Sequence, residues 1–263
     1  MGIVNLTPDS FSGDGVAANT ARAVEHAHQQ IAAGADILDL GAESSRPGAI
    51  PATQEQELER LVPVLEALAG CGVPISIDTY KPEVMRAAIE NGAALINDIY
   101  ALRRPGALEA VAASDCGVCL MHMQGEPLTM QAHPDYSDVL GDVRDFLKNR
   151  VEAAVAAGIA PERIVLDPGF GFGKTLEHNL ILLARLEKTK LRTSIGSFPI
   201  LAGMSRKSML GAITGQPVNE RLPASVTAAL IAVQRGARIV RVHDVAATRD
   251  ALAVWQAVSA FEC

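Results

Sequence analysis

The chain has 263 residues, of which 49% are hydrophobic and 20% charged, and 30 acidic residues outnumber 23 basic ones to give a formal net charge of −7. This acidic balance and an aromatic content of 4% offer neither a basic field for phosphate backbones nor many surfaces on which bases could stack, so we expect no nucleic-acid partner. No apolar run reaches the roughly 18 residues of a membrane span and no signal peptide begins the sequence, so we expect a cytoplasmic protein with no membrane partner.

Short apolar runs alternate with Ala-rich segments of helical periodicity along the chain, a pattern typical of βα units. The apolar runs lack polar alternation, which indicates strands buried on both faces. Their C-terminal ends recur about every 34 residues, the length of a strand, a helix and two loops. Eight strands are expected, over residues 2–5, 37–40, 74–78, 95–97, 118–121, 164–167, 199–203 and 239–241.

Helices are predicted most clearly over residues 21–33, 54–69 and 82–90, with a further apolar helix near 223–234. The first three end close to Gly34, Gly70 and Gly92, and Pro82 occupies a first-turn position. Eight βα units in this length predict an α/β fold, a (β/α)8 TIM barrel. The lack of a Pro/Gly/Ser linker predicts a single domain over residues 1–263.

A doubly wound open sheet is the alternative fold. Its G-x-G-x-x-G fingerprint is missing after the first strand, where Asn-Leu-Thr-Pro-Asp-Ser stands at 5–10. Because the first strand opens the given sequence, the floor of the barrel would have no N-terminal cover unless the natural chain begins upstream of Met1.

Polar side chains stand at the expected C-terminal strand ends, where barrels of this type build their active sites. A single Asp there is more often a cap or turn former, but polar residues recur across the eight units: Asn5, Asp39, Asp78, Asn97, His122, Asp167, Ser205 with Lys207, and Arg241 with His243. Carboxylates and amides suit ring N–H and amino groups, whereas Arg46, Arg241 and His243 suit a phosphate. The pattern indicates a ligand with a donor-rich heterocycle at one end and an anion at the other.

Three glycine-rich or long loops follow strands. The run Asp-Pro-Gly-Phe-Gly-Phe-Gly-Lys-Thr at 167–175 is not a Walker loop, because Pro168 takes the place of the first glycine. We interpret it as a flexible loop that places Phe170 and Phe172 beside a ligand ring. The loops over 7–19 and 42–53 are rich in turn formers, as lids often are.

Four cysteines are too few and too scattered for a disulfide framework, which suits a reducing compartment. Only Cys116 and Cys119 have the spacing of a redox or zinc pair. A zinc site would need a second close pair, and the apolar neighbours of Cys119 favour a buried strand, so we interpret both as core residues.

Eight segments in chain order resemble the dihydropteroate synthase family. They are Met-Gly-Ile-Val-Asn-Leu-Thr-Pro-Asp-Ser-Phe-Ser (1–12), Glu-Ser-Ser-Arg-Pro-Gly (43–48), Asp-Thr-Tyr-Lys-Pro (78–82), Asn-Asp-Ile (97–99), Met-His-Met-Gln-Gly (121–125), Asp-Pro-Gly-Phe-Gly-Phe-Gly-Lys (167–174), Gly-Met-Ser-Arg-Lys-Ser (203–208) and Arg-Val-His-Asp (241–244).

The resemblance implies an enzyme of folate biosynthesis that joins 4-aminobenzoate to 6-hydroxymethyl-7,8-dihydropterin diphosphate, with Mg²⁺ as cofactor and pyrophosphate as the second product. It also implies a sulfonamide target and a homodimer. Ser45 departs from the Thr common in the family, which leaves the hydroxyl and removes a methyl group.

The resemblance implies site residues in overlapping sets. Pterin contacts would come from Asp78, Asn97, Ile99, Met121, Asp167, Phe172, Gly203 and Lys207. Diphosphate contacts would come from Asn5, Arg46, Arg241 and His243, with Asn5 also the metal ligand. Aminobenzoate contacts would come from Phe11, Ser45, Arg46, Pro47, Phe172, Lys207 and Ser208. The catalytic set would be Asp78, Asp167, Lys207 and Arg241.

An arylamine is a weak nucleophile, so we expect a dissociative displacement in which departure of pyrophosphate leads. Two other functions stay open on the residues. A methyltetrahydrofolate-dependent methyltransferase could share the pterin pocket but would need no phosphate cluster, and a non-catalytic pterin-binding protein would bind without turnover.

Overall fold

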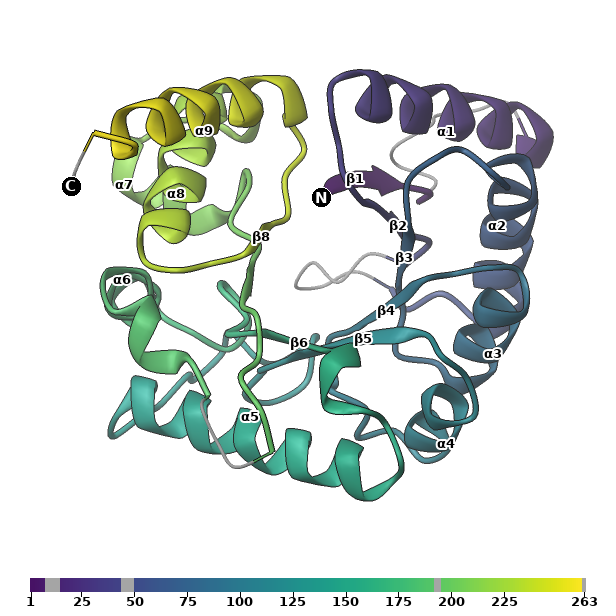
Figure 1. The fold of residues 1–263 in the computed structure, drawn as a ribbon, viewed down its shortest axis with the longest axis horizontal. Coiled ribbons are helices and arrows are strands. Elements are labelled where there is room, and N and C mark those ends of the chain that lie inside the picture. The colour runs from purple at the N-terminus through teal and green to yellow at the C-terminus, as the bar shows by residue number, and fades with distance from the viewer. Residues whose placement is uncertain (8–14, 44–49, 192–194, 262–263) are drawn as a thin grey trace.

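The structure is a computed structural model that describes residues 1–7, 15–43, 50–191 and 195–261. Strands lie at the centre and helices form a ring around them (Figure 1). The strands are β1 Gly2–Asn5, β2 Leu38–Gly41, β3 Ile75–Asp78, β4 Leu95–Asp98, β5 Gly117–Met121, β6 Ile164–Asp167, β7 Leu201–Ala202 and β8 Ile239–Val240. The helices are α1 Gly15–Ala32, α2 Gln54–Ala67, α3 Pro82–Glu90, α4 Ala107–Ala112, α5 Val139–Ala156, α6 Leu176–Ala184, α7 Ser208–Thr214, α8 Leu222–Gln234 and α9 Val245–Ser259.

The eight parallel strands close into a barrel. Strands β1 to β6 pair in chain order and β7 pairs with β8. Parallel bridges between Leu166 and Ile200 and between Gly2 and Val242 join these two pieces at both sides, and the N–H of Ile3 donates to the carbonyl of Val242 at 3.0 Å. The predicted barrel is confirmed, and the open-sheet alternative is wrong because the first and last strands are hydrogen-bonded together.

Helix ends follow local signals that the sequence carries. Helix α2 begins after a capping box in which Thr53 and Gln56 each accept from the other's backbone N–H. Helix α3 spans the predicted residues, with Pro82 in its first turn. The loop expected over 7–19 is shorter than predicted, since α1 begins at Gly15 and its Ala-rich start favours helix. None of the helices traced in the described ranges is long and apolar enough to cross a bilayer.

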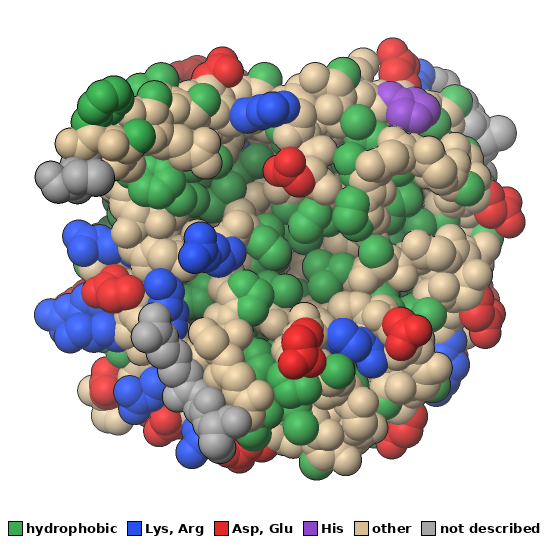
Figure 2. Space-filling view, in the orientation of Figure 1, with side chains coloured by type: hydrophobic (Ala, Val, Ile, Leu, Met, Phe, Trp, Pro, Cys, Tyr) green, Lys and Arg blue, Asp and Glu red, His purple; other side chains and the backbone are tan. Residues whose placement is uncertain are grey.

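The interior of the barrel changes character along its axis. The end of the barrel at which the strands begin is apolar. Met1, Cys119 and Leu201 are buried there, and Ile37, Leu95, Val165 and Ile239 pack against them. Hydrophobic side chains gather at the centre of the molecule in the end-on view (Figure 2). Two residues beyond Ile37 along β2 the interior becomes polar, with Asp39 and its neighbour Ser76 on β3 fully buried. Cys116 and Cys119 are buried free thiols, as predicted.

Candidate active site

Polar side chains from β2, β3 and β4 meet inside the barrel around Arg241, which follows β8. Its Nε donates to Asp39 Oδ2 at 2.5 Å and its Nη2 donates to Asp78 Oδ2 at 2.9 Å. Asp39 also accepts from Ser76 Oγ at 2.5 Å and from Asn97 Nδ2 at 3.4 Å. The structure therefore brings together Asp78, Asn97 and Arg241, three of the predicted site residues.

The charges in this cluster influence one another. Burial raises the pKa of Asp78 to about 7, although the Arg241 guanidinium opposes the rise. Burial acts to lower the pKa of Arg241, but Asp39 and Asp78 outweigh it and raise that pKa. The site thus holds a permanent cation beside a carboxyl group that changes charge near neutral pH.

A second pair of charged groups consists of Asp167, which ends β6, and Lys207, which directly precedes α7. The Asp167 carboxylate accepts from the N–H of Gly169 at 2.7 Å. Burial raises its pKa, and Lys207 and that N–H oppose the rise. Burial lowers the pKa of Lys207 to about 8, opposed by Asp167. Lys207 donates to the carbonyl of Phe170, and its Nζ lies 4.4 Å from the centroid of the Phe172 ring.

The prediction that both phenylalanines of this loop face a ligand is wrong for Phe170. Phe170 is fully buried in the main core between the barrel and its helices. Gly169 and Gly171 flank it with φ values of +71° and +79°, a left-handed conformation that glycine adopts without strain. The loop therefore turns so that Phe170 packs inward, and Phe172 alone is available to a ligand ring.

An apolar wall lies beside the charged groups. Ile99 and Met121, both predicted pterin contacts, are buried in one cluster with Met123, and Phe172 packs against it. The Tyr80 ring also packs there. Such a wall suits a flat heterocycle whose edge meets the carboxylates.

The other described candidates line the same end of the barrel. Gly203 lies against the stem of Arg241, since a Cβ added there would meet Arg241 Cβ at 3.7 Å. His243 has its backbone N–H and Nδ1 at 3.2 and 3.0 Å from Ser205 Oγ. Asn5 ends β1 and is half-buried.

Ser208 opens α7 and is exposed. Phe11, Ser45, Arg46 and Pro47 lie outside the described residues, as do most of the two predicted lids.

Sequence reasoning places Asp39 among the polar strand-end residues without a specific role and does not single out Ser76. The structure makes Asp39 the common acceptor for three side chains. Its signal was an acidic residue between Leu38 and Leu40 in an otherwise apolar strand, which burial tolerates only when the charge is paired.

A further ionic network lies just after β3 and was also missed. Lys81 forms ion pairs with Glu43 and with the buried Glu57. Thr79 Oγ1 donates to Glu57 at 2.9 Å, and the Tyr80 hydroxyl donates to Glu43 at 2.7 Å. Burial raises the pKa of Glu57 to about 7, opposed by Lys81. The network ties the end of β3 to α2 and to the segment that follows β2.

The described side chains contain no group of three or more His, Cys, Asp or Glu arranged for a metal ion. Mg²⁺ commonly takes one or two protein oxygens and completes its shell with phosphate oxygens and water. The amide oxygen of Asn5, at the mouth end of β1, has the chemistry for such a single contact.

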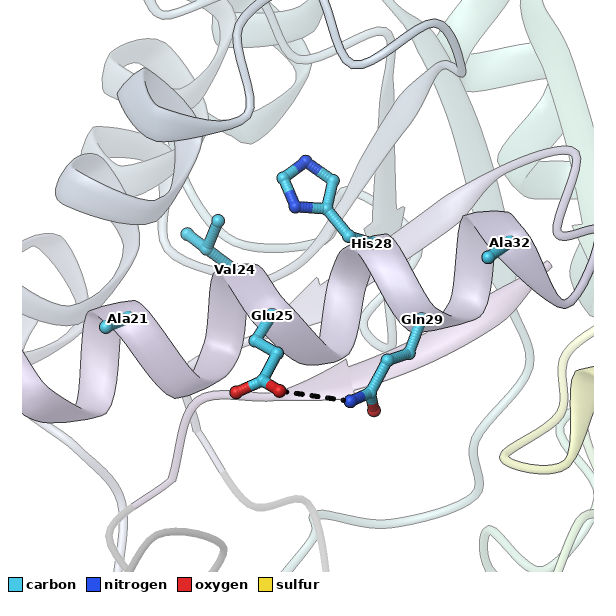
Figure 3. Close-up of a pocket in the computed structure, with 6 residues that line it drawn as sticks. All are labelled: Ala21, Val24, Glu25, His28, Gln29 and Ala32. Carbon is cyan, nitrogen blue, oxygen red and sulfur yellow. Dashed lines mark hydrogen bonds between the residues drawn. The ribbon is translucent and has the colours of Figure 1, made fainter.

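An open depression lies on the outer surface of α1, lined by Ala21, Val24, Glu25, His28, Gln29 and Ala32 (Figure 3). Gln29 Nε2 donates to Glu25 at 3.4 Å across it. Because a single exposed helix face forms this depression, it offers no convergent groups and we assign it no chemistry.

The barrel mouth thus offers hydrogen-bond acceptors, two cations and an apolar wall. Residues 1–243 match the family described as pterin binding enzyme. The chain is 53% identical over 264 residues to the dihydropteroate synthase of Neisseria meningitidis serogroup B, an alignment that covers 98% of this chain and 92% of that protein.

Two solved structures show the same fold with ligands. The dihydropteroate synthase of Burkholderia cenocepacia, complexed with 7,8-dihydropteroate, is 56% identical with a TM-score of 0.91, covering 99% of this chain and 91% of that chain. The dihydropteroate synthase of Xanthomonas albilineans, with 4-aminobenzoic acid, is 51% identical with a TM-score of 0.91, covering 99% and 92%.

Proposed function

This chain belongs to the dihydropteroate synthase family of pterin-binding enzymes, and from that premise we propose that it joins 4-aminobenzoate to 6-hydroxymethyl-7,8-dihydropterin diphosphate in folate biosynthesis. The amine nitrogen bonds to the pterin methylene carbon, the carbon–oxygen bond to the diphosphate breaks with its electron pair, and the amine loses a proton. The products are 7,8-dihydropteroate and pyrophosphate. The observation that carries the proposal is the convergence of Asp78, Asn97 and Arg241 beside Asp167 and Lys207.

The pterin edge is the part of the substrate that these acceptors recognise. Asp78, Asn97 and Asp167 supply oxygens for the ring N–H and amino groups, because carboxylates accept two hydrogen bonds side by side. Lys207 donates to an acceptor on the ring. The wall of Ile99, Met121 and Phe172, together with Gly203 beside the stem of Arg241, excludes water from the ring faces.

The diphosphate lies toward the cations of the mouth. Arg241 keeps N–H groups for a phosphate oxygen beyond its bonds to Asp39 and Asp78, since a guanidinium carries donors on three nitrogens. His243 and Arg46 complete the anion site in this proposal, and Asn5 would hold Mg²⁺. When bound, the metal supplies positive charge to the departing oxygens.

Departure of pyrophosphate leads the reaction in this proposal. Positive charge develops on the methylene carbon and the pterin ring, and the ionised Asp78 and Asp167 stabilise it. Arg241, with Arg46 and His243, stabilises the negative charge on the departing pyrophosphate. No covalent enzyme intermediate forms.

The aminobenzoate lies at the outer end of the site. Phe172 and the stem of Lys207 flank it, with Ser208 at the start of α7. Phe11, Ser45, Arg46 and Pro47 supply its remaining contacts in this proposal.

Pyrophosphate release from purified protein tests the function directly. The pterin diphosphate and Mg²⁺ are supplied with and without 4-aminobenzoate, and we expect release only when all are present. Pterin binding without release under either condition would contradict catalysis and favour a non-catalytic pterin-binding protein. Release without 4-aminobenzoate would indicate hydrolysis.

Pterin affinity should fall as the pH drops below about 7. Burial raises the pKa of Asp78 to about 7, so at lower pH a ligand that needs the carboxylate must first displace a proton. The dissociation constant should then rise about tenfold per pH unit below that value and stay level above it. Asp39, Asp98, Glu57 and Arg241 influence this titration.

Calorimetry with 6-hydroxymethyl-7,8-dihydropterin measures this, because a ligand without diphosphate adds no phosphate titration. A dissociation constant that stays level from about pH 5 to pH 9 would contradict the role of Asp78.

We propose that the protein is a homodimer that pairs through the surface of α7 and α8. Apolar side chains are exposed at Ile213 in α7, at Val218 between the two helices and at Leu222 in α8, with exposed fractions of 53%, 53% and 40%. Packing this surface against the same surface of a second copy removes its apolar side chains from water and so stabilises a dimer. Sedimentation velocity should show a dimer, and a monomer at every concentration would contradict it.

We also propose that residues 1–263 are one barrel domain in the cytoplasm. Helix α9 follows the region matched by the family, yet Val245 is buried in the core and α9 packs on α8. Limited proteolysis that released a stable smaller core, or recovery of the protein outside the cytoplasmic fraction of cells, would contradict these two statements.

A further inference from the structure

The loop over residues 168–173 is held by side chains along its whole length. Five successive backbone carbonyls, those of residues 169 to 173, each accept a hydrogen bond from a side chain. The donors, in carbonyl order, are Lys174, Lys207, Gln131, Lys174 and the hydroxyl of Tyr136. A loop after a barrel strand is usually free to move, so this degree of anchoring calls for a cause.

Lys174 is the residue that anchors the loop twice. Its side chain is buried, with 3% of the residue exposed. Its Nζ lies 2.9 Å from the carbonyl of Gly169, 3.0 Å from that of Phe172 and 2.9 Å from His122 Nδ1. Burial lowers the pKa of Lys174 well below its usual value, opposed by Asp167. Three uncharged acceptors nonetheless surround Nζ, as many as an ammonium group has N–H donors. Burying a lysine is costly, so this arrangement is retained against a penalty.

His122 completes the set because its ring is kept neutral. Burial, with Lys174 adding to it, lowers the pKa of His122 to about 2. A neutral imidazole can present Nδ1 as an acceptor while Nε2 carries the proton. The ring is held from the side by Phe146, edge to face at 4.9 Å between centroids.

Gly169 connects this anchor to the pterin site. Its carbonyl accepts from Lys174, and its N–H donates to the Asp167 carboxylate at 2.7 Å. The second carbonyl that Lys174 holds belongs to Phe172, whose ring packs on the apolar wall. One side-chain nitrogen therefore holds the backbone at Gly169, next to Asp167, and at Phe172, and Asp167 and Phe172 are both proposed pterin contacts.

We propose that Lys174, held by His122, is a positioning residue that keeps the loop at 168–173 in the form that binds the pterin. The inference rests on the proposed function and deepens it. Lys174 touches no substrate and acts through Asp167 and Phe172. Without it the carbonyls of Gly169 and Phe172 lose their side-chain donor, and the Gly169 carbonyl keeps only its bond from the Phe172 N–H. The backbone that presents the Gly169 N–H to Asp167 is then less constrained, so the Asp167 carboxylate loses its fixed direction.

Two substitutions at different residues test this, with affinity for 6-hydroxymethyl-7,8-dihydropterin diphosphate measured by calorimetry and thermal unfolding followed without ligand. Lys174→Met should weaken binding at least about tenfold, because it removes the three hydrogen bonds of a buried side chain that holds the loop. Lys148→Met, at a half-exposed lysine of α5, should bind like the wild type.

A pair of variants at His122 distinguishes a role in hydrogen bonding from a role in packing. His122→Asn keeps an oxygen near the position of Nδ1, whereas His122→Leu fills the space without an acceptor. We expect the Asn variant to bind within about threefold of the wild type and the Leu variant at least about tenfold more weakly. A role in packing alone would favour the bulkier Leu, so this rescue distinguishes the two, and the pair remains informative if Lys174→Met does not fold.

Two results would count against the inference. Wild-type affinity in Lys174→Met would overturn it, as would equal losses in the two His122 variants. Failure of the wild-type protein to bind the pterin diphosphate would instead contradict the proposed function from which the inference starts.

Discussion

Asp78→Asn is expected to leave the fold intact and to lower kcat by about 10³-fold, which corresponds to about 4 kcal/mol of transition-state stabilisation. Asp78 ends β3 inside the barrel mouth, where its carboxylate accepts from Arg241 at 2.9 Å. An amide of the same shape keeps the packing, and Arg241 keeps its bond to Asp39. The variant loses the negative charge that would face the developing cation.

Pyrophosphate release at saturating substrates measures this effect. Asp115→Asn replaces an exposed carboxylate before β5 and should retain the wild-type rate. Circular dichroism shows whether each variant folds. A folded Asp78→Asn enzyme that works within about threefold of the wild type would remove Asp78 from the catalytic set.

Gly169→Ala should be the most destabilising of the small substitutions, lowering the free energy of unfolding by about 3 to 5 kcal/mol. A Cβ at this position would lie 1.9 Å from the carbonyl oxygen of His122, which is backbone and cannot move aside cheaply. The φ of +71° adds strain of its own. Relief requires the loop to shift, which would also break the bonds to Asp167 and Lys174.

Gly70→Ala is the matched control. Gly70 has a φ of +74°, close to that of Gly169, but a Cβ there would meet nothing within 4 Å. It should lose only the strain of the left-handed conformation, about 1 kcal/mol. Thermal and urea unfolding compare the two variants. Equal losses would show that the contact with His122 does not matter.

The order of strands and helices could be predicted because burial leaves a local signature. A strand covered on both faces reads as a continuous apolar run, as Ile164–Asp167 does before its final Asp, and a helix such as Pro82–Glu90 carries its own start and stop signals. The last two strands are shorter than predicted, since Leu201–Ala202 and Ile239–Val240 pair over only two residues each.

The candidate site could be predicted only in its membership. The sequence predicts five central site residues from the polar strand ends and from the eight segments that resemble one family. They are Asp78, Asn97, Asp167, Lys207 and Arg241. The contacts between these side chains were not predictable, because they depend on which strands and loops the tertiary fold brings together. Phe170 shows the limit, since the same loop places it in the core and Phe172 at the wall.

By itself the sequence determined the βα order and the family and predicted the barrel, because these depend on local periodicity and on residue types at fixed places along the chain. Closure was decided by the pairing of the first strand with Val242 after the last. The tertiary structure alone decided how the charges pair. Asp39 and Arg241 are 202 residues apart, and Lys174 meets His122 across 52 residues. Such pairs form only when closure of the barrel brings distant strands together, and their energies depend on a burial that no local pattern records.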